Sequence, residues 1–439
     1  MRVHRCRRLR KLLALAMGTM VALATAAATI DAQTDSSWRD HERALQAART
    51  AHDTATYRAQ LNAIQRAIGA TPRIAVRQAA LALGAHDSIA ASRWMGVLAA
   101  MGDALDTTLV TQYDALAGPR AIESLQTVHA LATRDVGAPV VVARLPDADM
   151  ISEDIAYDAQ RQRFLVSSVH HGGIYSVTNG RTAPFIEPGR DSTWGIFALA
   201  VDTARRALWA TTSAFSPITA RYTRADSGRS ALLKYDLHTG VLRGKYVAPD
   251  TGAHALGDIV VAGSGAVYVS DGLGSGVYAM VPGGVSLRVL VAPGAFRSPQ
   301  TPALSSDEST LFVPDYAIGI AAVDIATGAL TWVTHSDSLA LTGIDGMYRV
   351  GHDLIAVQNG LEPNRIMRLS LDPSMRRVVS ATAIARGRAA KSLTHATVVG
   401  GWLYFLTKSG WERAADDGTI TAAAGAAEAP VIVRVRIAR

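Results

Sequence analysis

The sequence predicts a mainly β fold, a six-bladed β-propeller, preceded by an α-helical domain and a signal peptide. Three observations support this prediction: an apolar segment follows a basic N-terminus, apolar residues then recur three and four apart, and from about residue 139 their period changes to two. We therefore expect a signal peptide over residues 1–32, a helical domain over 36–135 and the propeller over 139–439.

The N-terminus has the two features of an export signal. The basic stretch MRVHRCRRLRK precedes an uncharged, mostly apolar run from Leu12 to Ile30. About 20 apolar residues are also enough to span a bilayer, so an uncleaved membrane anchor remains the alternative interpretation. Small residues at alternate positions, as in Ala24-Thr25-Ala26, favour cleavage. We expect a periplasmic or secreted protein with no membrane span after cleavage.

Composition excludes several classes of protein. The net charge is +7, but residues 1–32 hold six basic side chains and one acidic one, which leaves 38 basic (44 − 6) and 36 acidic (37 − 1) residues. So small an excess gives no indication of nucleic-acid binding. The single cysteine, Cys6, lies within the predicted signal. The exported chain is therefore expected to have no disulfide, no thiolate zinc site and no cysteine nucleophile.

The helical prediction rests on Ala- and Leu-rich segments that are separated by Gly, Pro and Asp. We expect five helices, over residues 38–53, 54–69, 72–87, 88–103 and 118–135. Short turns between them indicate helical hairpins. The stretch from Thr71 to Gly102 resembles a tetratricopeptide repeat, with a small helical bundle as the alternative. A helical repeat would offer a face for a protein or peptide partner.

The propeller prediction rests on a repeated unit of short strands. The unit opens at six positions spaced 44 to 60 residues apart: Glu153, Phe197, Gly257, Thr301, Asp345 and His395. This spacing is typical of propeller blades, each built from four short strands. The segment VVVARLP after Pro139 is expected to close the last blade. A seven-bladed propeller and a two-sheet arrangement remain as alternatives.

The starts of the blades point to a functional site. The first strand of each propeller blade lines the central channel, so residues at these starts should converge at one mouth. The polar or charged candidates are Glu153, Asp154, His254, Asp258, Gln300, Asp345 and His395.

Four segments carry a resemblance to a known family. They are ISEDIAYD with RFLVSSV, HALGDIVVAGSGAVYVSD, SPQTPALSSDESTLFVPDYAIGIAAVDIATG, and GIDGM with LIAVQNG. Over residues 140–439 the chain resembles the gluconolactonase/regucalcin-like (senescence marker protein) six-bladed propellers. Members of that family bind a divalent metal, often calcium, at the channel mouth, and many hydrolyse lactones or other esters. The resemblance implies that Glu153 and Asp345 bind the metal and that Asp345 also transfers protons.

The chain departs from this family at the middle ligands. Gly257 precedes Asp258 where the family has asparagine, and Gln300 stands at the next asparagine position. Glu153, Asp258, Gln300 and Asp345 would still offer the oxygen ligands that calcium requires. If the rings of His254 and His395 face the channel, zinc is the alternative metal.

The expected reaction is hydrolysis of a small lactone or ester. A metal would polarise the carbonyl group, and Asp345 would move the proton, with His395 as a rival base. No G-x-S-x-G motif favours a serine nucleophile. We expect Asp154, His254, Trp194 and Asn359 to line the substrate pocket, with Trp411 in a loop able to wall it. The alternative is a non-catalytic envelope protein that binds a partner and has a degenerate metal site.

Overall fold

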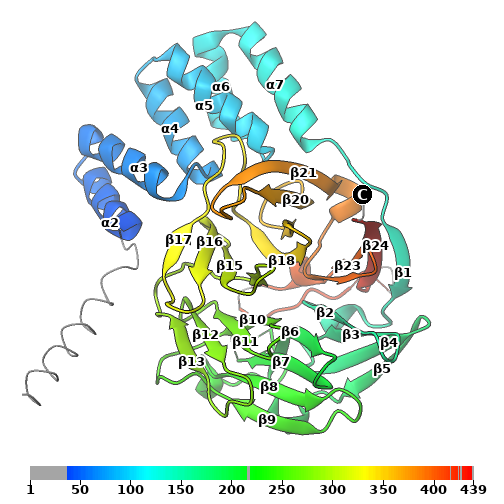
Figure 1. The fold of residues 1–439 in the computed structure, drawn as a ribbon. Coiled ribbons are helices and arrows are strands. Elements are labelled where there is room, and N and C mark those ends of the chain that lie inside the picture. The colour runs from blue at the N-terminus through cyan, green and yellow to red at the C-terminus, as the bar shows by residue number, and fades with distance from the viewer. Residues whose placement is uncertain (1–36, 215–217, 416, 424, 426–427, 438–439) are drawn as a thin grey trace, which may run out of the picture.

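The computed structural model describes residues 37–214, 218–415, 417–423, 425 and 428–437. In these residues, six helices are followed by a ring of six β-sheets (Figure 1). This confirms the predicted six-bladed propeller with N-terminal helices. The predicted signal peptide, residues 1–32, lies outside the described residues.

The helical region consists of six helices that pack as successive pairs. The helices are α2 (Ser37–Thr50), α3 (Thr54–Ile68), α4 (Pro72–Gly84), α5 (Ser88–Met101), α6 (Thr107–Ala117) and α7 (Pro119–Thr133). Four helices begin at a residue whose side chain accepts a bond from the backbone N–H three positions on: Asp53, Thr71, Asp87 and Asp106. Helix α6 was not expected, because only Leu109 and Tyr113 are buried along it and they give little periodicity.

Each propeller blade is a four-stranded antiparallel sheet. Blade one contains β2 (Ile155–Asp158), β3 (Arg163–Ser167), β4 (Ile174–Thr178) and β5 (Arg181–Ile186), and blade two contains β6 (Gly195–Asp202), β7 (Ala207–Ser213), β8 (Ser230–Asp236) and β9 (Leu242–Tyr246). Blade three contains β10 (Leu256–Val261), β11 (Val267–Asp271), β12 (Gly276–Met280) and β13 (Arg288–Val291), and blade four contains β14 (Ala303–Leu304), β15 (Thr310–Asp315), β16 (Gly319–Asp324) and β17 (Leu330–Trp332). Blade five contains β18 (Ile344–Val350), β19 (Asp353–Gln358), β20 (Arg365–Leu371) and β21 (Val378–Arg386).

Blade six joins the two ends of the propeller sequence. It contains β22 (Ala396–Val399), β23 (Trp402–Thr407) and β24 (Val431–Arg436), and its outer strand is β1 (Val140–Arg144). Strand β1 runs antiparallel to β24, with Val141 opposite Val433. The predicted closing strand is thus confirmed, and the ring is closed by a segment that precedes the first blade.

The core lies between neighbouring blades, where side chains from facing sheets interdigitate. Phe312 and Met347 pack between blades four and five, and Phe405 packs with Ile355 between blades five and six. Tyr278 packs against Trp209 between blades two and three. Many of the inner strands are thus buried on both faces, which explains why they appear in the sequence as short, nearly continuous apolar runs.

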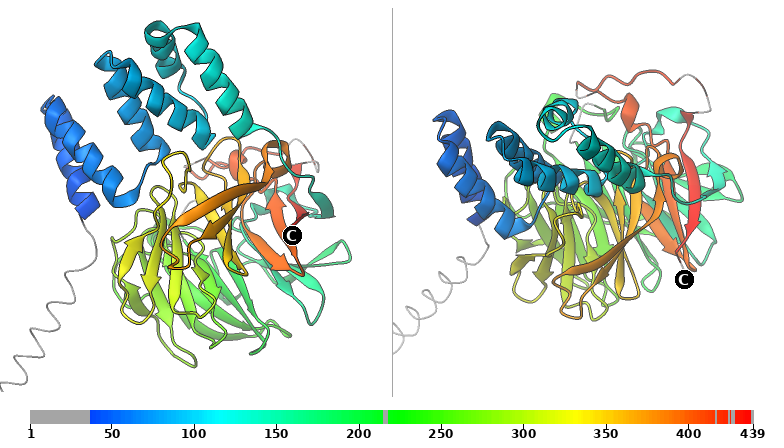
Figure 2. Two further views of the ribbon diagram at one scale, coloured as in Figure 1. Left: turned by 45° about the horizontal axis from the view of Figure 1, so that its top comes forward. Right: turned by 90° about the horizontal axis from the view of Figure 1, so that it is seen from above.

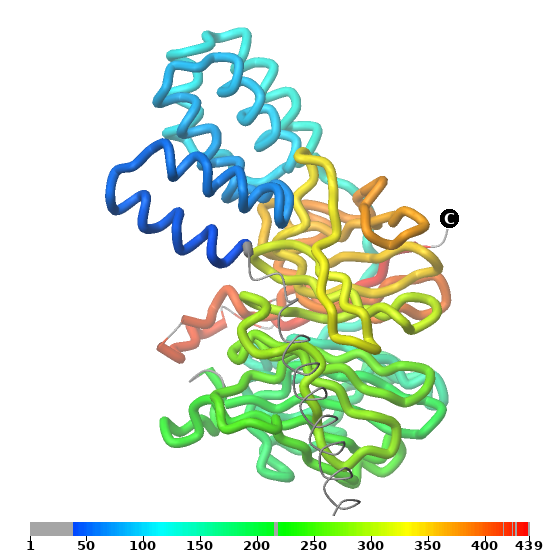
Figure 3. The backbone as a smooth tube through the Cα atoms, turned by 60° about the vertical axis from the view of Figure 1, so that its left-hand side comes forward, coloured from blue at the N-terminus to red at the C-terminus, as the bar shows by residue number. Residues whose placement is uncertain are grey.

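The helices lie over one edge of the propeller (Figures 2 and 3) and contact blades four and five. Ile318 is buried among side chains of α2 to α4, and Leu361 among those of α4 to α7. The guanidinium of Arg365 donates a hydrogen bond to the carbonyl oxygen of Met101 at the end of α5, 2.7 Å away. Among the residues that the structure describes, no helix has the length and apolar character needed to cross a bilayer.

Removal of the closing strand is expected to destabilise the propeller. A chain that begins at Pro146 should unfold about 10 °C lower than one that begins at Pro139, because it loses β1 and leaves the edge of β24 unpaired. Both chains lack the helices, so their difference isolates the strand. Thermal unfolding followed by circular dichroism measures the effect, and equal midpoints would show that closure by β1 adds no stability.

Candidate functional site

Irregular first strands aim side chains at the channel. The register shifts between Leu256 and Ile259 in β10, and between Ile344 and Gly346 in β18. A bulge of this kind breaks the strict alternation of a strand and redirects a side chain. Asp258 and Asp345 lie within these bulges. Both side chains are buried, and so are those of Leu256 and Ile344, the first residues of the two strands. The bulges therefore place two carboxylates inside the ring.

Two glycines allow the loop around Asp345 to form. Gly343 has φ of +69°, and a Cβ atom on it would lie 2.8 Å from the Cα atom of Gly360. A Cβ atom on Gly360 would in turn lie 2.6 Å from the Cα atom of Gly343. This close approach brings Asn359 beside Asp345, where its amide nitrogen donates a 2.6 Å hydrogen bond to Asp345 Oδ2.

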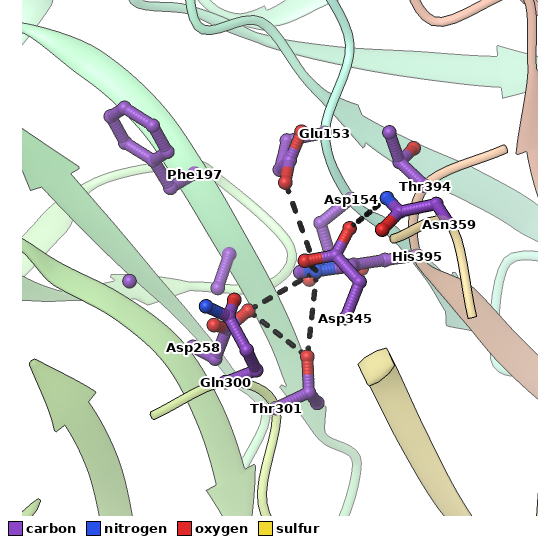
Figure 4. Close-up of polar contacts among 12 residues, drawn as sticks. Glu153, Asp154, Phe197, Asp258, Gln300, Thr301, Asp345, Asn359, Thr394 and His395 are labelled. Atoms are coloured by element: carbon purple, nitrogen blue, oxygen red, sulfur yellow. Dashed lines mark hydrogen bonds and ion pairs between the residues drawn. The ribbon is translucent and has the colours of Figure 1, made fainter. Parts of the chain in front are cut away.

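Three carboxylates converge on one edge of a buried histidine ring (Figure 4). Nε2 of His395 lies 3.4 Å from an oxygen of Asp258, 3.6 Å from one of Asp345 and 3.8 Å from one of Glu153. The His395 side chain is only 2% exposed. These four residues come from blades one, three, five and six, so the ring of blades itself assembles the cluster.

A fourth carboxylate lies on the other side of the histidine ring. Nδ1 of His395 is 3.6 Å from Oδ1 of Asp154, and it has no hydrogen-bond partner within the described part of the chain. Asp154 is held by the backbone N–H groups of Ile155 and Leu199, each 2.7 Å from one of its oxygens. It borders a second cavity of about 440 Å³, together with Thr301. Asp154 was expected in the substrate pocket, but the structure places it behind His395.

Burial and mutual repulsion raise the proton affinity of this cluster. Burial, helped by the negative charge of Asp345, raises the pKa of Glu153 to about 8. Burial also raises the pKa of Asp258 to about 7, although the charge of His395 opposes it. For His395 burial lowers the pKa, but the carboxylates of Asp258 and Asp345 outweigh burial and raise it well above its ordinary value. Positive charge is therefore strongly favoured at the centre of the cluster.

The geometry of the donors fits a shared cation. Glu153, Asp345 and His395 each offer one ligand atom, and these atoms lie within 4.8 Å of one another. Two ligands that each lie about 2.1–2.4 Å from one cation, at about 90–110° to each other, are separated by about 3.0–3.9 Å. The separations of 3.4–3.8 Å around Nε2 fall in this range and are mostly too long for hydrogen bonds.

A small cavity opens onto the cluster at one channel mouth. Its volume is about 230 Å³, and Glu153, Asp258 and Gln300 contribute polar groups to its wall. Two aromatic side chains, Phe197 and Trp411, complete the wall. The indole N–H of Trp411 donates a hydrogen bond to Glu153 Oε2. Phe197 lies in a bulge of β6; it opens the second repeat unit, but only the polar and charged residues at the unit starts are predicted as site residues.

Two of the expected pocket residues lie elsewhere. Nδ1 of His254 is 2.6 Å from Asp271 and its Nε2 is 3.0 Å from Asp250, so both ring nitrogens are engaged away from His395. His254 and Trp194 line a separate cavity of about 620 Å³ beside blades two and three. The prediction that the ring of His254 faces the channel cluster is therefore wrong, because a carboxylate at the end of β11 holds that ring.

The remaining candidates border the cluster without entering it. Gln300 lines the small cavity, but its amide nitrogen is bonded to Ser298 Oγ at 2.8 Å. Asn359 contacts Asp345 and accepts a hydrogen bond from the hydroxyl of Tyr316 at 3.0 Å. Gln300 therefore lies where it can orient a substrate, whereas Asn359, expected in the substrate pocket, is not among the residues that line the cavity and positions Asp345 instead.

No model of a protein family matches the chain, and no curated protein does. Among solved structures, a calcium-binding protein, regucalcin, from Agrobacterium tumefaciens is similar, with 15% identity, a TM-score of 0.48, and coverage of 70% of this chain and 97% of that one. A gluconolactonase from Xanthomonas campestris has 16% identity, a TM-score of 0.45 and coverage of 69% and 97%. An aldose sugar dehydrogenase from Streptomyces coelicolor, in its PQQ-bound form, has 17% identity, a TM-score of 0.47 and coverage of 70% and 99%. At these identities the likeness concerns the fold alone.

Proposed function

We propose that the propeller is a metal-dependent hydrolase that opens a small lactone or cleaves a small ester at the channel mouth. The observation that carries this proposal is the set of three carboxylates around Nε2 of His395, two buried and that of Glu153 partly buried, beside a cavity of about 230 Å³. Neither a hydrophobic core nor an ordinary salt bridge needs so many ionisable groups in one place, because their burial is costly unless a cation joins them.

The ligands would be Glu153, Asp345 and His395, with Asp258 next to them. A divalent cation at this site would act as a Lewis acid on the substrate carbonyl and on water. An imidazole ligand favours a transition metal such as zinc, the carboxylates would also suit manganese, and calcium prefers oxygen ligands alone. Asp154 would hold the far side of the His395 ring, as carboxylates commonly do for a metal-binding histidine.

Asp258 is the proposed proton-transfer group. It borders the cavity and accepts a hydrogen bond from Thr301 at 3.0 Å, so its carboxylate lies within reach of both a substrate and the proposed cation site. Its carboxylate would take a proton from water as the water oxygen bonds to the acyl carbon. It would return that proton to the alcohol oxygen as the acyl C–O bond breaks. Asp345 and His395 do not line the cavity, so we propose them as ligands and not as the base.

The cavity restricts the substrate to a small molecule with polar and apolar faces. Phe197 and Trp411 offer flat aromatic surfaces, and Gln300 offers an amide. A lactone ring with hydroxyl groups would meet both kinds of surface. Export of the chain, implied by its N-terminal sequence, would place this activity in the periplasm or outside the cell.

The test combines metal content with turnover. Purified protein is analysed for bound metals, stripped with a chelator, and reloaded with zinc, manganese or calcium in separate samples. Each sample is then assayed against a panel of lactones and small esters. We expect about one cation per chain, release of protons on reloading because His395 and the carboxylates lose theirs, and hydrolysis that stops in chelator.

Two outcomes would change the proposal. A chain that binds one cation but hydrolyses nothing on the panel supports the alternative, a binding protein that uses its channel for recognition. A chain that binds no cation at pH 8 contradicts the metal site itself. In that case His395 acts as a permanent imidazolium that balances the carboxylates.

A further inference from the structure

A second, larger groove lies between the helices and blade five, away from the channel. Its volume is about 800 Å³. One wall is the outer face and edge of β21, from Val378 to Ala383, and the opposite wall includes Met101 of α5 and Ala132 of α7. The segment from Ser336 to Leu339 borders one end. The groove therefore lies where the helical region meets blade five.

Strand β21 is the outermost strand of its sheet, and its free edge faces this groove. The edge is covered only at its two ends: Val378 N–H donates to the carbonyl oxygen of Thr334, and Arg386 exchanges two hydrogen bonds with Val136. Between these ends, no strand of the described chain pairs with β21. Val379 is 59% exposed, and Ser380 and Thr382 are also exposed. A free edge of this length can accept one more strand.

The groove is strongly positive. Four arginines line it, Arg134, Arg365, Arg377 and Arg386, and none of its lining residues is acidic. Arg365 is 3% exposed and Arg386 is 8% exposed, and within the described residues neither forms an ion pair. They donate instead to neutral groups, Arg365 to Gln358 Oε1 at 2.8 Å and Arg386 to the carbonyl oxygen of Arg134 at 2.8 Å.

We propose that this groove binds an extended acidic segment of a partner protein, which adds to β21 as a fifth strand of blade five. The free edge offers backbone hydrogen bonds, and the arginines offer charge-assisted bonds to carboxylates. Side chains of a strand alternate between its two faces, so acidic residues at every second position would all point to one side. This site is independent of the proposed hydrolase activity.

The test uses the full chain and fluorescein-labelled peptides in an anisotropy titration. The probe is a ten-residue peptide of alternating valine and glutamate. One control peptide replaces glutamate by lysine, and another keeps the glutamates but carries two prolines, which prevent strand pairing. We expect saturable binding of the probe, and binding at least about tenfold weaker for either control.

Charge-reversal variants locate the site. The double variant Arg134→Glu with Arg377→Glu should weaken binding of the probe by about tenfold. The matched variant Arg58→Glu with Arg181→Glu changes the net charge equally at exposed positions outside the groove and should bind as the wild type does. Amide hydrogen exchange should show new protection at Ser380 and Thr382 when the probe is bound.

Any of three results with the valine–glutamate probe would overturn the proposal. They are absence of saturable probe binding, equal affinity of the two double variants, and probe binding without protection in β21. Equal binding of the proline-interrupted peptide would show an anionic ligand site without strand addition, and would also reject the proposal. Thermal unfolding of each variant ensures that a loss of binding reflects the groove and not a loss of fold.

Discussion

Replacement of Asp345 by asparagine is expected to abolish tight binding of a divalent cation and to lower turnover by about a thousandfold. The change keeps the size of the side chain and its hydrogen bond from Asn359, but it removes one of the carboxylates around Nε2 of His395. Loss of one charged ligand weakens both the attraction for the cation and the activation of the substrate. Calorimetric titration with the metal and steady-state kinetics on the best substrate measure the two effects.

The matched control is Asp271→Asn. Asp271 is also fully buried at the end of a strand, but it bonds to His254 and lies outside the channel cluster. This variant should lose stability and keep one cation per chain and most of its turnover per folded molecule. If both variants lose metal equally, the loss reflects general damage to the propeller. If Asp345→Asn keeps full affinity and activity, Asp345 is not a ligand.

The second prediction concerns pH in the chelated protein. Its free energy of unfolding should fall by several kcal/mol as the pH rises from about 5 to about 8.5. The folded chain keeps protons on Glu153 and Asp258 up to pKa values of about 8 and about 7, whereas the unfolded chain releases them near pH 4 to 5. His395, whose pKa is also raised, adds a loss of the same sign above pH 6.5.

A bound cation should remove most of this pH dependence, because it replaces the protons that the cluster holds. Urea unfolding at pH 5.5 and pH 8.5, with chelator and with saturating metal, gives the four values needed. The double variant Glu153→Gln with Asp258→Asn should show a flatter profile in chelator than the wild type. Stability of the chelated wild type that rises between these pH values would refute the raised pKa values of the cluster.

Much of the channel site could be predicted from the phase of the repeat. Glu153, Asp258, Asp345 and His395 each lie at the start of a blade, and a residue at that position faces the channel whatever its surroundings. The position of each residue within the repeat was therefore enough to predict that these four side chains lie close together. The closing strand was predictable for a similar reason, because VVVARLP is a strand with no blade of its own.

Other features depended on contacts that no repeat encodes. His254 precedes a blade start by three residues, but its ring turns to Asp271 because that carboxylate ends the adjacent strand. The bulges that aim Asp258 and Asp345 inward have no distinct sequence pattern. The outer strands β9 and β13 are only partly buried, so they lack the apolar runs that revealed the inner strands.

The contact between Glu153 and His395 also sets the order in which the molecule can mature. The two residues belong to the first and last blades, and the backbone N–H of His395 donates to the carbonyl oxygen of Glu153 at 3.2 Å. During synthesis, the first blade is made long before its partner, so the ligand set is incomplete until the last blade has emerged. Contacts so distant in sequence form late and slowly. If the cluster binds a cation as proposed, its capture would be the final step of biogenesis, and an unfinished chain would lack the complete site and the stability that the cation adds.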